Sequence, residues 1–135
     1  MNIVLWVLQV LLALAFFAHG WLLLSPPAEM VELLNSLIQP AFRIFLGVAE
    51  VLAAVGLIVP GVTRIQPWLV SCAAAGLLPV MIGATVLHTG RGEVTSAITT
   101  ACLFVLLAFV AYMRWKVTPL LPRTVSKNRG HGMVT

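Results

Sequence analysis

Two polar residues in otherwise apolar stretches are the strongest candidates for chemistry in this chain. Glu50 lies deep in one apolar stretch, and His19 lies just before Gly20 near the end of an earlier one. An ionised carboxylate costs several kcal/mol to hold in hydrocarbon, so Glu50 must be neutralised, paired or turned to a polar cavity. Because a carboxyl and an imidazole can exchange protons, we expect Glu50 and His19 to be the reactive groups.

Arg43 precedes Glu50 by seven residues, and Gly47 lies between them. Seven helical steps return to within about 20° of the starting direction, so these three residues share one helix face. This face predicts a ligand-binding notch, with the Arg43 cation at its mouth and the Glu50 carboxyl at its floor. In this site the His19 imidazole hydrogen-bonds to Glu50 or to a ligand. The alternative is structural: Arg43 reaches to the membrane surface, and Glu50 and His19 only make hydrogen bonds to neighbouring helices.

Thr85 and His88 share a face at the end of a third apolar stretch, and we include them with Arg43 and Gly47 as ligand-binding candidates. The alternative for His88 is a helix-end residue at the membrane boundary. The two cysteines have no metal-ligand spacing, and no cofactor motif such as GxGxxG or CxxCH occurs. Two histidines on different helices are only a weak pattern for haem ligation. The sequence therefore predicts no metal site and no intrinsic cofactor.

The composition is that of an integral membrane protein. The 135 residues are 61% hydrophobic and 9% charged, whereas a soluble domain is about 25% charged. Four apolar stretches are close to the ~20 residues that span a bilayer. These are approximately 2–24, 40–60 (ending at Pro60-Gly61), 65–88 and 94–115. We predict an all-α, four-helix transmembrane bundle in a single domain, residues 1–118.

The segment between the first two spans has a different pattern. Its apolar residues recur at helical spacing from Met30 to Ile38, with Glu29, Glu32 and Asn35 on the opposite face. This pattern predicts a short amphipathic helix in the membrane interface. The alternative is a lid over the bundle.

The positive charges predict the orientation of the spans. Five of the eight Lys and Arg residues lie in the last 22 residues, and Arg64 joins them on the same side. Only Arg43 and Arg91 fall on the other side. The positive-inside rule therefore predicts both termini in the cytoplasm and a location in the cytoplasmic membrane. Residues 119–135 are expected to form a basic cytoplasmic tail that contacts lipid rather than nucleic acid.

In this orientation the polar residues of the spans converge on the outer half of the bundle. The inner half has only three polar or weakly polar side chains within the spans, Gln9, Ser71 and Cys72. This asymmetry is the main argument for an outer site. Cys72 and Cys102 are expected to be small core residues, and small residues such as Gly76 and Gly83 are expected at close helix contacts.

Three motifs resemble the DoxX and DoxX-like family of small four-helix membrane proteins. They are residues 16–20 (FFAHG), residues 43–50 (RIFLGVAE) and Leu87-His88 with Arg91-Gly92-Glu93. Many relatives carry a lysine shortly after the glycine of the first motif, whereas this chain continues with Trp21. The resemblance implies a four-helix bundle. In some members it also implies association with thiosulfate:quinone oxidoreductase or other redox assemblies.

Three functions fit these observations, and the first is favoured. In the first, the chain is a membrane subunit of a redox assembly and binds a quinone through Arg43, His19 and Glu50. The redox centre is then on a partner subunit. Alternatively, it is an isomerase or cyclase in which Glu50 is the general acid or base for a lipophilic substrate such as a terpenoid, with His19 as proton partner. In the third, Arg43 and Glu50 only lock helices in an assembly protein. Self-association into a homo-oligomer is compatible with all three.

Overall fold

The computed structural model describes residues 2–123 as helices joined by short connections, without strands in this range. The elements are α1 (Asn2–Leu24), α2 (Ala28–Leu37), α3 (Pro40–Thr63), α4 (Leu69–Gly90), α5 (Val94–Tyr112) and a π-helical turn, η1 (Met113–Val117). Four helices, with η1 continuing α5, are long and apolar enough to cross a membrane. The prediction of an all-α membrane protein with four apolar helices is therefore confirmed. The short helix α2 is present, and its position in the interface stays a prediction.

Two boundaries differ from those expected, both near prolines. The second span does not end at Pro60, because α3 continues to Thr63 and finishes at Arg64, whose φ is 57°. A proline in the last turn removes only one backbone hydrogen bond, so the turn survives. The next helix begins four residues later than expected, because Gln66 (φ 48°) and Pro67 leave the helical path.

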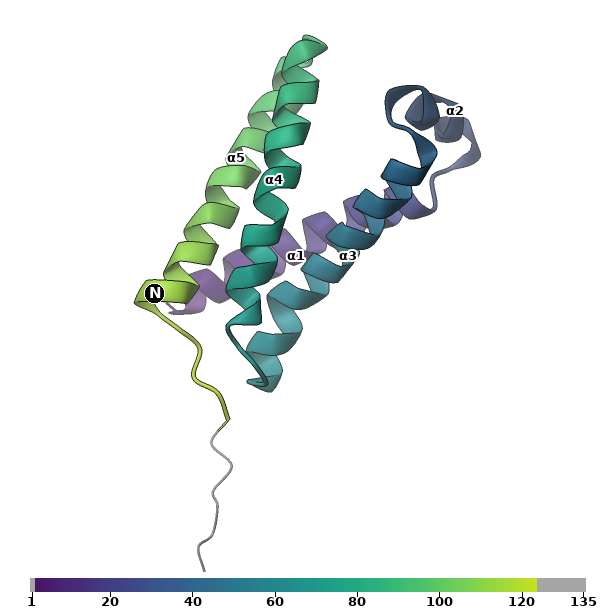
Figure 1. Cartoon of the computed structure of the whole chain (residues 1–135). Helices are drawn as coiled ribbons and strands as arrows, with labels where there is room; N and C mark the ends of the chain where they lie inside the picture. Colours follow the sequence, from purple (N-terminus) through teal and green to yellow (C-terminus); the bar gives the residue numbers. More distant parts are fainter. Residues whose placement is uncertain (1, 124–135) are drawn as a thin grey trace, which may run out of the picture.

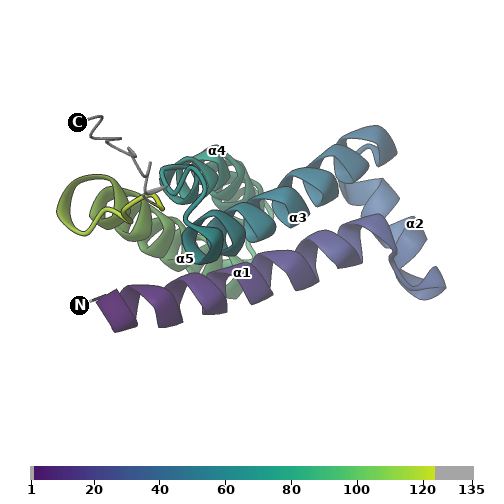
Figure 2. The ribbon, with the colours of Figure 1, turned by 90° about the horizontal axis from the view of Figure 1, so that it is seen from below.

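The long helices form two antiparallel pairs. In Figures 1 and 2, α1 lies along α3 and α4 lies along α5, and α3 contacts α4. Figure 1 shows the α1–α3 pair inclined to the α4–α5 pair, so that the pairs diverge toward α2. We call the end with α2 and the α4–α5 connection the α2 end, and the opposite end, where α1 begins, the tail end.

The core lies where the two pairs meet. Leu57, Ala74, Leu107 and Val110 are fully buried there, and Leu12 and Phe16 of α1 join them. Large apolar side chains on the outer faces are exposed, as expected where helices contact lipid. Cys72 and Cys102 are also exposed. The prediction of core cysteines was wrong because both residues point away from the place where the helix pairs meet.

The chain folds back after η1. The backbone N–H of Arg123 donates to the Arg64 carbonyl over 3.2 Å, which holds residues 118–123 against the α3–α4 connection. The first residues of the expected tail thus line the tail end of the protein. The rest of that tail, including Lys127 and Arg129, lies outside the described residues.

Candidate functional site

The site begins with a close approach of two backbones, at Gly20 of α1 and Gly47 of α3. A Cβ atom on Gly20 would lie 2.9 Å from the Gly47 carbonyl oxygen and 3.0 Å from Glu50 Cβ. A Cβ atom on Gly47 would lie 2.9 Å from the Gly20 carbonyl oxygen. Small residues allow membrane helices to pack this closely. Because His19 precedes Gly20 and Glu50 lies one turn beyond Gly47, this contact brings His19 and Glu50 together.

His19 and Glu50 form a hydrogen-bonded pair of unequal exposure. His19 Nδ1 lies 2.6 Å from Glu50 Oε2. The Glu50 side chain is 1% exposed, whereas the His19 side chain is 57% exposed. Within residues 2–123, the Glu50 carboxyl forms its side-chain hydrogen bond with His19. The buried carboxyl is therefore connected to the outside of the helix pair through an imidazole.

Arg43 lies near this pair but serves a different group. Its buried guanidinium donates through Nη1 to the Leu23 carbonyl, in the last turn of α1. A cation is favourable at a helix C-terminus, where carbonyls lack helical partners. Arg43 and Glu50 are roughly 10 Å apart along the helix axis, and the described residues contain no ion pair between them. Arg43 is thus buried against the end of α1, which it caps, and it does not pair with Glu50.

The space over Gly47 is filled. A Cβ atom there would lie 2.8 Å from Leu24 Cγ as well as close to the Gly20 carbonyl. The expected notch between Arg43 and Glu50 is therefore occupied by α1 itself. Gly47 acts on the site by allowing α1 to come close.

Thr85 and His88 belong to the other helix pair. The hydroxyl oxygens of Thr85 and Thr100 lie 2.8 Å apart, which joins α4 to α5. His88 Nδ1 lies 2.5 Å from Glu93 Oε2 at the α4–α5 connection. The two pairs diverge at this end (Figure 1). The structure therefore brings His19 and Glu50 together with Arg43 nearby, and it places Thr85 and His88 elsewhere.

A second polar cluster lies at the tail end, where the sequence predicts almost none. Arg114 donates through Nε to Gln9 Oε1 and through Nη1 to Asn2 Oδ1, each over 2.6 Å. Gln9 Nε2 donates to the Leu57 carbonyl over 2.8 Å. The guanidinium also lies 5.4 Å from the centre of the Trp6 ring, which allows a cation–π contact. This network joins α1, α3 and η1.

The helical spacing of Arg114 and Gln9 relative to apolar residues could have predicted this network. Arg114 follows Leu107 and Val110 by seven and four residues, so it continues the buried face of α5. Gln9 lies in the same way between Leu5 and Leu12 on α1. Sequence reasoning missed the pair because it assigned Arg114 only to membrane orientation.

The comparison with known proteins concerns most of the helical region. The model of the DoxX-like family matches residues 7–111, which include His19, Arg43 and Glu50 and end before Arg114. Searches among curated proteins and among solved structures found no match. The match covers well over half of the chain and confirms the resemblance seen in its motifs. The chain belongs to the DoxX-like family.

Proposed function

We propose that this protein is a subunit of a membrane redox assembly, in which the His19–Glu50 pair exchanges protons with a quinone headgroup. The observation that carries the proposal is the unequal exposure of the pair, 57% for the His19 side chain and 1% for that of Glu50. A buried carboxyl with a polar partner inside a membrane helix is a functional site by default. Here the partner is accessible from outside the helix pair.

The imidazole is suited to carry a proton between the carboxyl and a ligand. Nδ1 faces Glu50, and Nε2 remains for a ligand oxygen. The proton of the pair has two arrangements: Nδ1–H donates to a carboxylate, or a protonated Glu50 donates to a neutral Nδ1. A quinone that is reduced takes up two electrons, here from a partner subunit, and two protons. Glu50 supplies one of these protons through His19, and water at the membrane surface supplies the other.

An enclosed cavity is unnecessary for this function, because quinones reside in the bilayer. An exposed imidazole on a transmembrane helix is accessible laterally to a headgroup. The isomerase or cyclase alternative requires a substrate that contacts Glu50 itself, and Glu50 is buried behind His19. The geometry therefore supports the imidazole as the group that meets the ligand.

The proposal also assigns a side of the membrane. With both termini in the cytoplasm, as the distribution of Lys and Arg favours, the α2 end faces outward. The His19–Glu50 pair then lies in the outer half of the membrane. In this arrangement α2, with Glu29 in its first turn, lies in the outer interface.

Tryptophan fluorescence tests whether a quinone binds at the His19–Glu50 pair, since Trp21 lies two residues after His19. The other three tryptophans, Trp6, Trp68 and Trp115, lie toward the tail end. The difference between wild type and Trp21→Phe isolates the signal of Trp21. Titration of proteoliposomes with a short-chain quinone should quench this signal saturably in the wild type.

The expected result for His19→Leu is loss of saturable quenching, because the ligand-facing donor is gone. Glu50→Gln should weaken binding about tenfold, a loss typical of one hydrogen bond in an apolar setting. Glu93→Gln is the matched control, because Glu93 also bonds to a histidine Nδ1 but in the α4–α5 pair. Equal quenching in all four proteins would contradict the proposal and favour the purely structural role.

A further inference from the structure

Arg114 is a buried cation without a carboxylate partner. The residue is 4% exposed, and its Nη2 atom is buried without a hydrogen-bond partner in the described residues. The four acidic residues of the chain are Glu29, Glu32, Glu50 and Glu93. All four belong to α2, to the His19 pair or to the α4–α5 connection, away from η1. A buried charge is costly unless it is paired. Residues 2–123 supply no counterion for Arg114.

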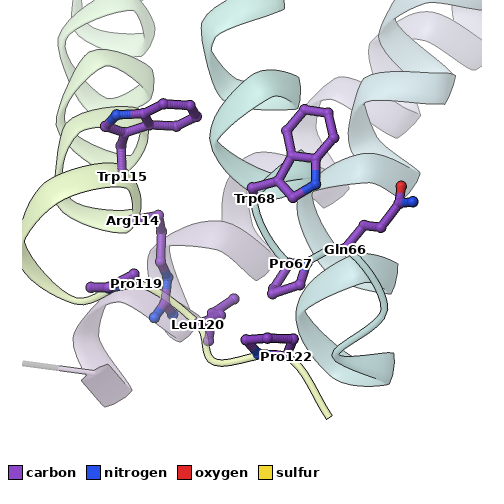
Figure 3. A pocket seen from close by; sticks show the side chains of 8 residues that line it. All are labelled: Gln66, Pro67, Trp68, Arg114, Trp115, Pro119, Leu120 and Pro122. Carbon is purple, nitrogen blue, oxygen red and sulfur yellow. The ribbon is translucent and has the colours of Figure 1, made fainter. Parts of the chain in front are cut away.

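A pocket of about 500 Å³ lies beside this guanidinium (Figure 3). Its lining comes from the α3–α4 connection, from η1 and from the segment after η1, and it includes Trp68, Arg114, Trp115, Pro119, Leu120 and Pro122. In Figure 3, Trp68 and Trp115 stand at one end of the pocket, and the guanidinium of Arg114 lies at the other end beside Leu120. The hydrogen bond from Arg123 to the Arg64 carbonyl holds the third wall in place.

The backbone next to the pocket forms a π-helical turn. The N–H of Thr118 donates to the Met113 carbonyl over 2.7 Å, which closes a π-helical turn. Such a turn contains one residue more than an α-helical turn and occurs frequently at functional sites. Here Met113 and Arg114 are both buried, whereas Trp115 is exposed at the rim of the pocket.

We propose that this pocket binds a phosphate group, and specifically the headgroup phosphate of an anionic phospholipid. Arg114 lines the pocket and keeps one unpaired donor, Nη2, which a small rotation of the guanidinium would turn to a phosphate oxygen for a charge-assisted hydrogen bond. Positive charge at the tail end of the protein is increased by Arg64, Lys116 and Arg123. The site lies at the opposite end from the His19–Glu50 pair and does not depend on the function proposed for that pair.

Two features favour a lipid over free phosphate. Trp68 and Trp115 are exposed at the ends of apolar helices, the position that tryptophans take at headgroup level. The remaining wall is largely apolar, with Pro119, Leu120 and Pro122 suited to contact a glycerol backbone and the first acyl carbons. Basic pockets at membrane interfaces bind anionic headgroups in this way.

The test is native mass spectrometry of the full chain with equal amounts of phosphatidylglycerol and phosphatidylcholine. The wild type should retain phosphatidylglycerol with about tenfold preference. The double variant Gln9→Leu with Arg114→Met should lose this preference, since it removes the cation without leaving Gln9 unpaired. Arg114→Lys, which keeps the charge but has no Nη2 donor, should lose most of it.

Arg91→Gln is the matched control, because it removes one positive charge at the α2 end and should keep the preference. Equal retention of both lipids by the wild type, or an unchanged preference in the double variant, would overturn the proposal. Excess inorganic phosphate distinguishes the two sources of phosphate. Displacement of phosphatidylglycerol by it would overturn the lipid assignment, and persistence of the bound lipid would support it.

Discussion

Replacing Gly47 with alanine is expected to destabilise the protein by about 1–3 kcal/mol, the usual cost of overpacking a close contact. The new Cβ atom would lie 2.9 Å from the Gly20 carbonyl oxygen and 2.8 Å from Leu24 Cγ. A leucine side chain can shift, but a backbone carbonyl moves only if α1 and α3 separate. The measurement is the free energy of unfolding from an SDS titration in mixed micelles.

Gly76→Ala is the matched control for this experiment. Gly76 lies on an apolar transmembrane helix, as Gly47 does, but a Cβ atom placed on it has no atom within 4 Å apart from its chain neighbours and the backbone of its own helix. We expect stability equal to the wild type or slightly higher, because alanine favours a helix over glycine. If both substitutions had the same effect, the close approach of α1 and α3 would be wrong, and with it the basis for the His19–Glu50 contact.

Replacing Gln9 with leucine is expected to destabilise the protein by about 3 kcal/mol. The substitution leaves Arg114 Nε buried without the Gln9 acceptor, and hydrogen bonds to buried charged groups are among the strongest. Arg114→Met should be similarly destabilising because it leaves Gln9 Oε1 unpaired. The same SDS titration measures both variants.

The double variant distinguishes this network from two independent contacts. When an apolar pair replaces both partners, no buried polar atom of the Gln9–Arg114 contact remains unpaired. We therefore expect stability within about 1 kcal/mol of the wild type. The coupling energy should then be several kcal/mol. Simple additivity of the two single substitutions would contradict the structure of this network.

The ends of the helices could be predicted from the sequence far better than their rotation about their own axes. The limits of α1 follow from its apolar length and from Pro26 and Pro27, and they agree with the structure. The packing of small residues does not follow, because lipid-facing and buried faces of a membrane helix are both apolar. Gly76 and Gly83 were expected at helix contacts, yet both face open space, and Gly20 and Gly47 make the contact instead.

The candidate site, too, could be predicted from the sequence only in part. Helical spacing correctly puts Arg43 and Glu50 on one face of α3, and both are buried. It does not determine where a long side chain ends, and Arg43 reaches along the axis to the last turn of α1. Thr85 and His88 fall in the same predicted outer half of the bundle as Glu50, but a shared half of the membrane cannot say that the helix pairs diverge there (Figure 1). The contact between His19 and Glu50 was one of the alternatives that the sequence left open.

In the proposed function, Glu50 exchanges a proton with a bound quinone through His19. Infrared difference spectroscopy on the protein with a short-chain quinone, reduced and reoxidised electrochemically, can detect this exchange. We predict a change in the carboxylic acid C=O stretch that is present in the wild type and in Glu93→Gln and absent in Glu50→Gln. A quinone that is bound and reduced without any such change in the wild type, or a change that persists in Glu50→Gln, would contradict it.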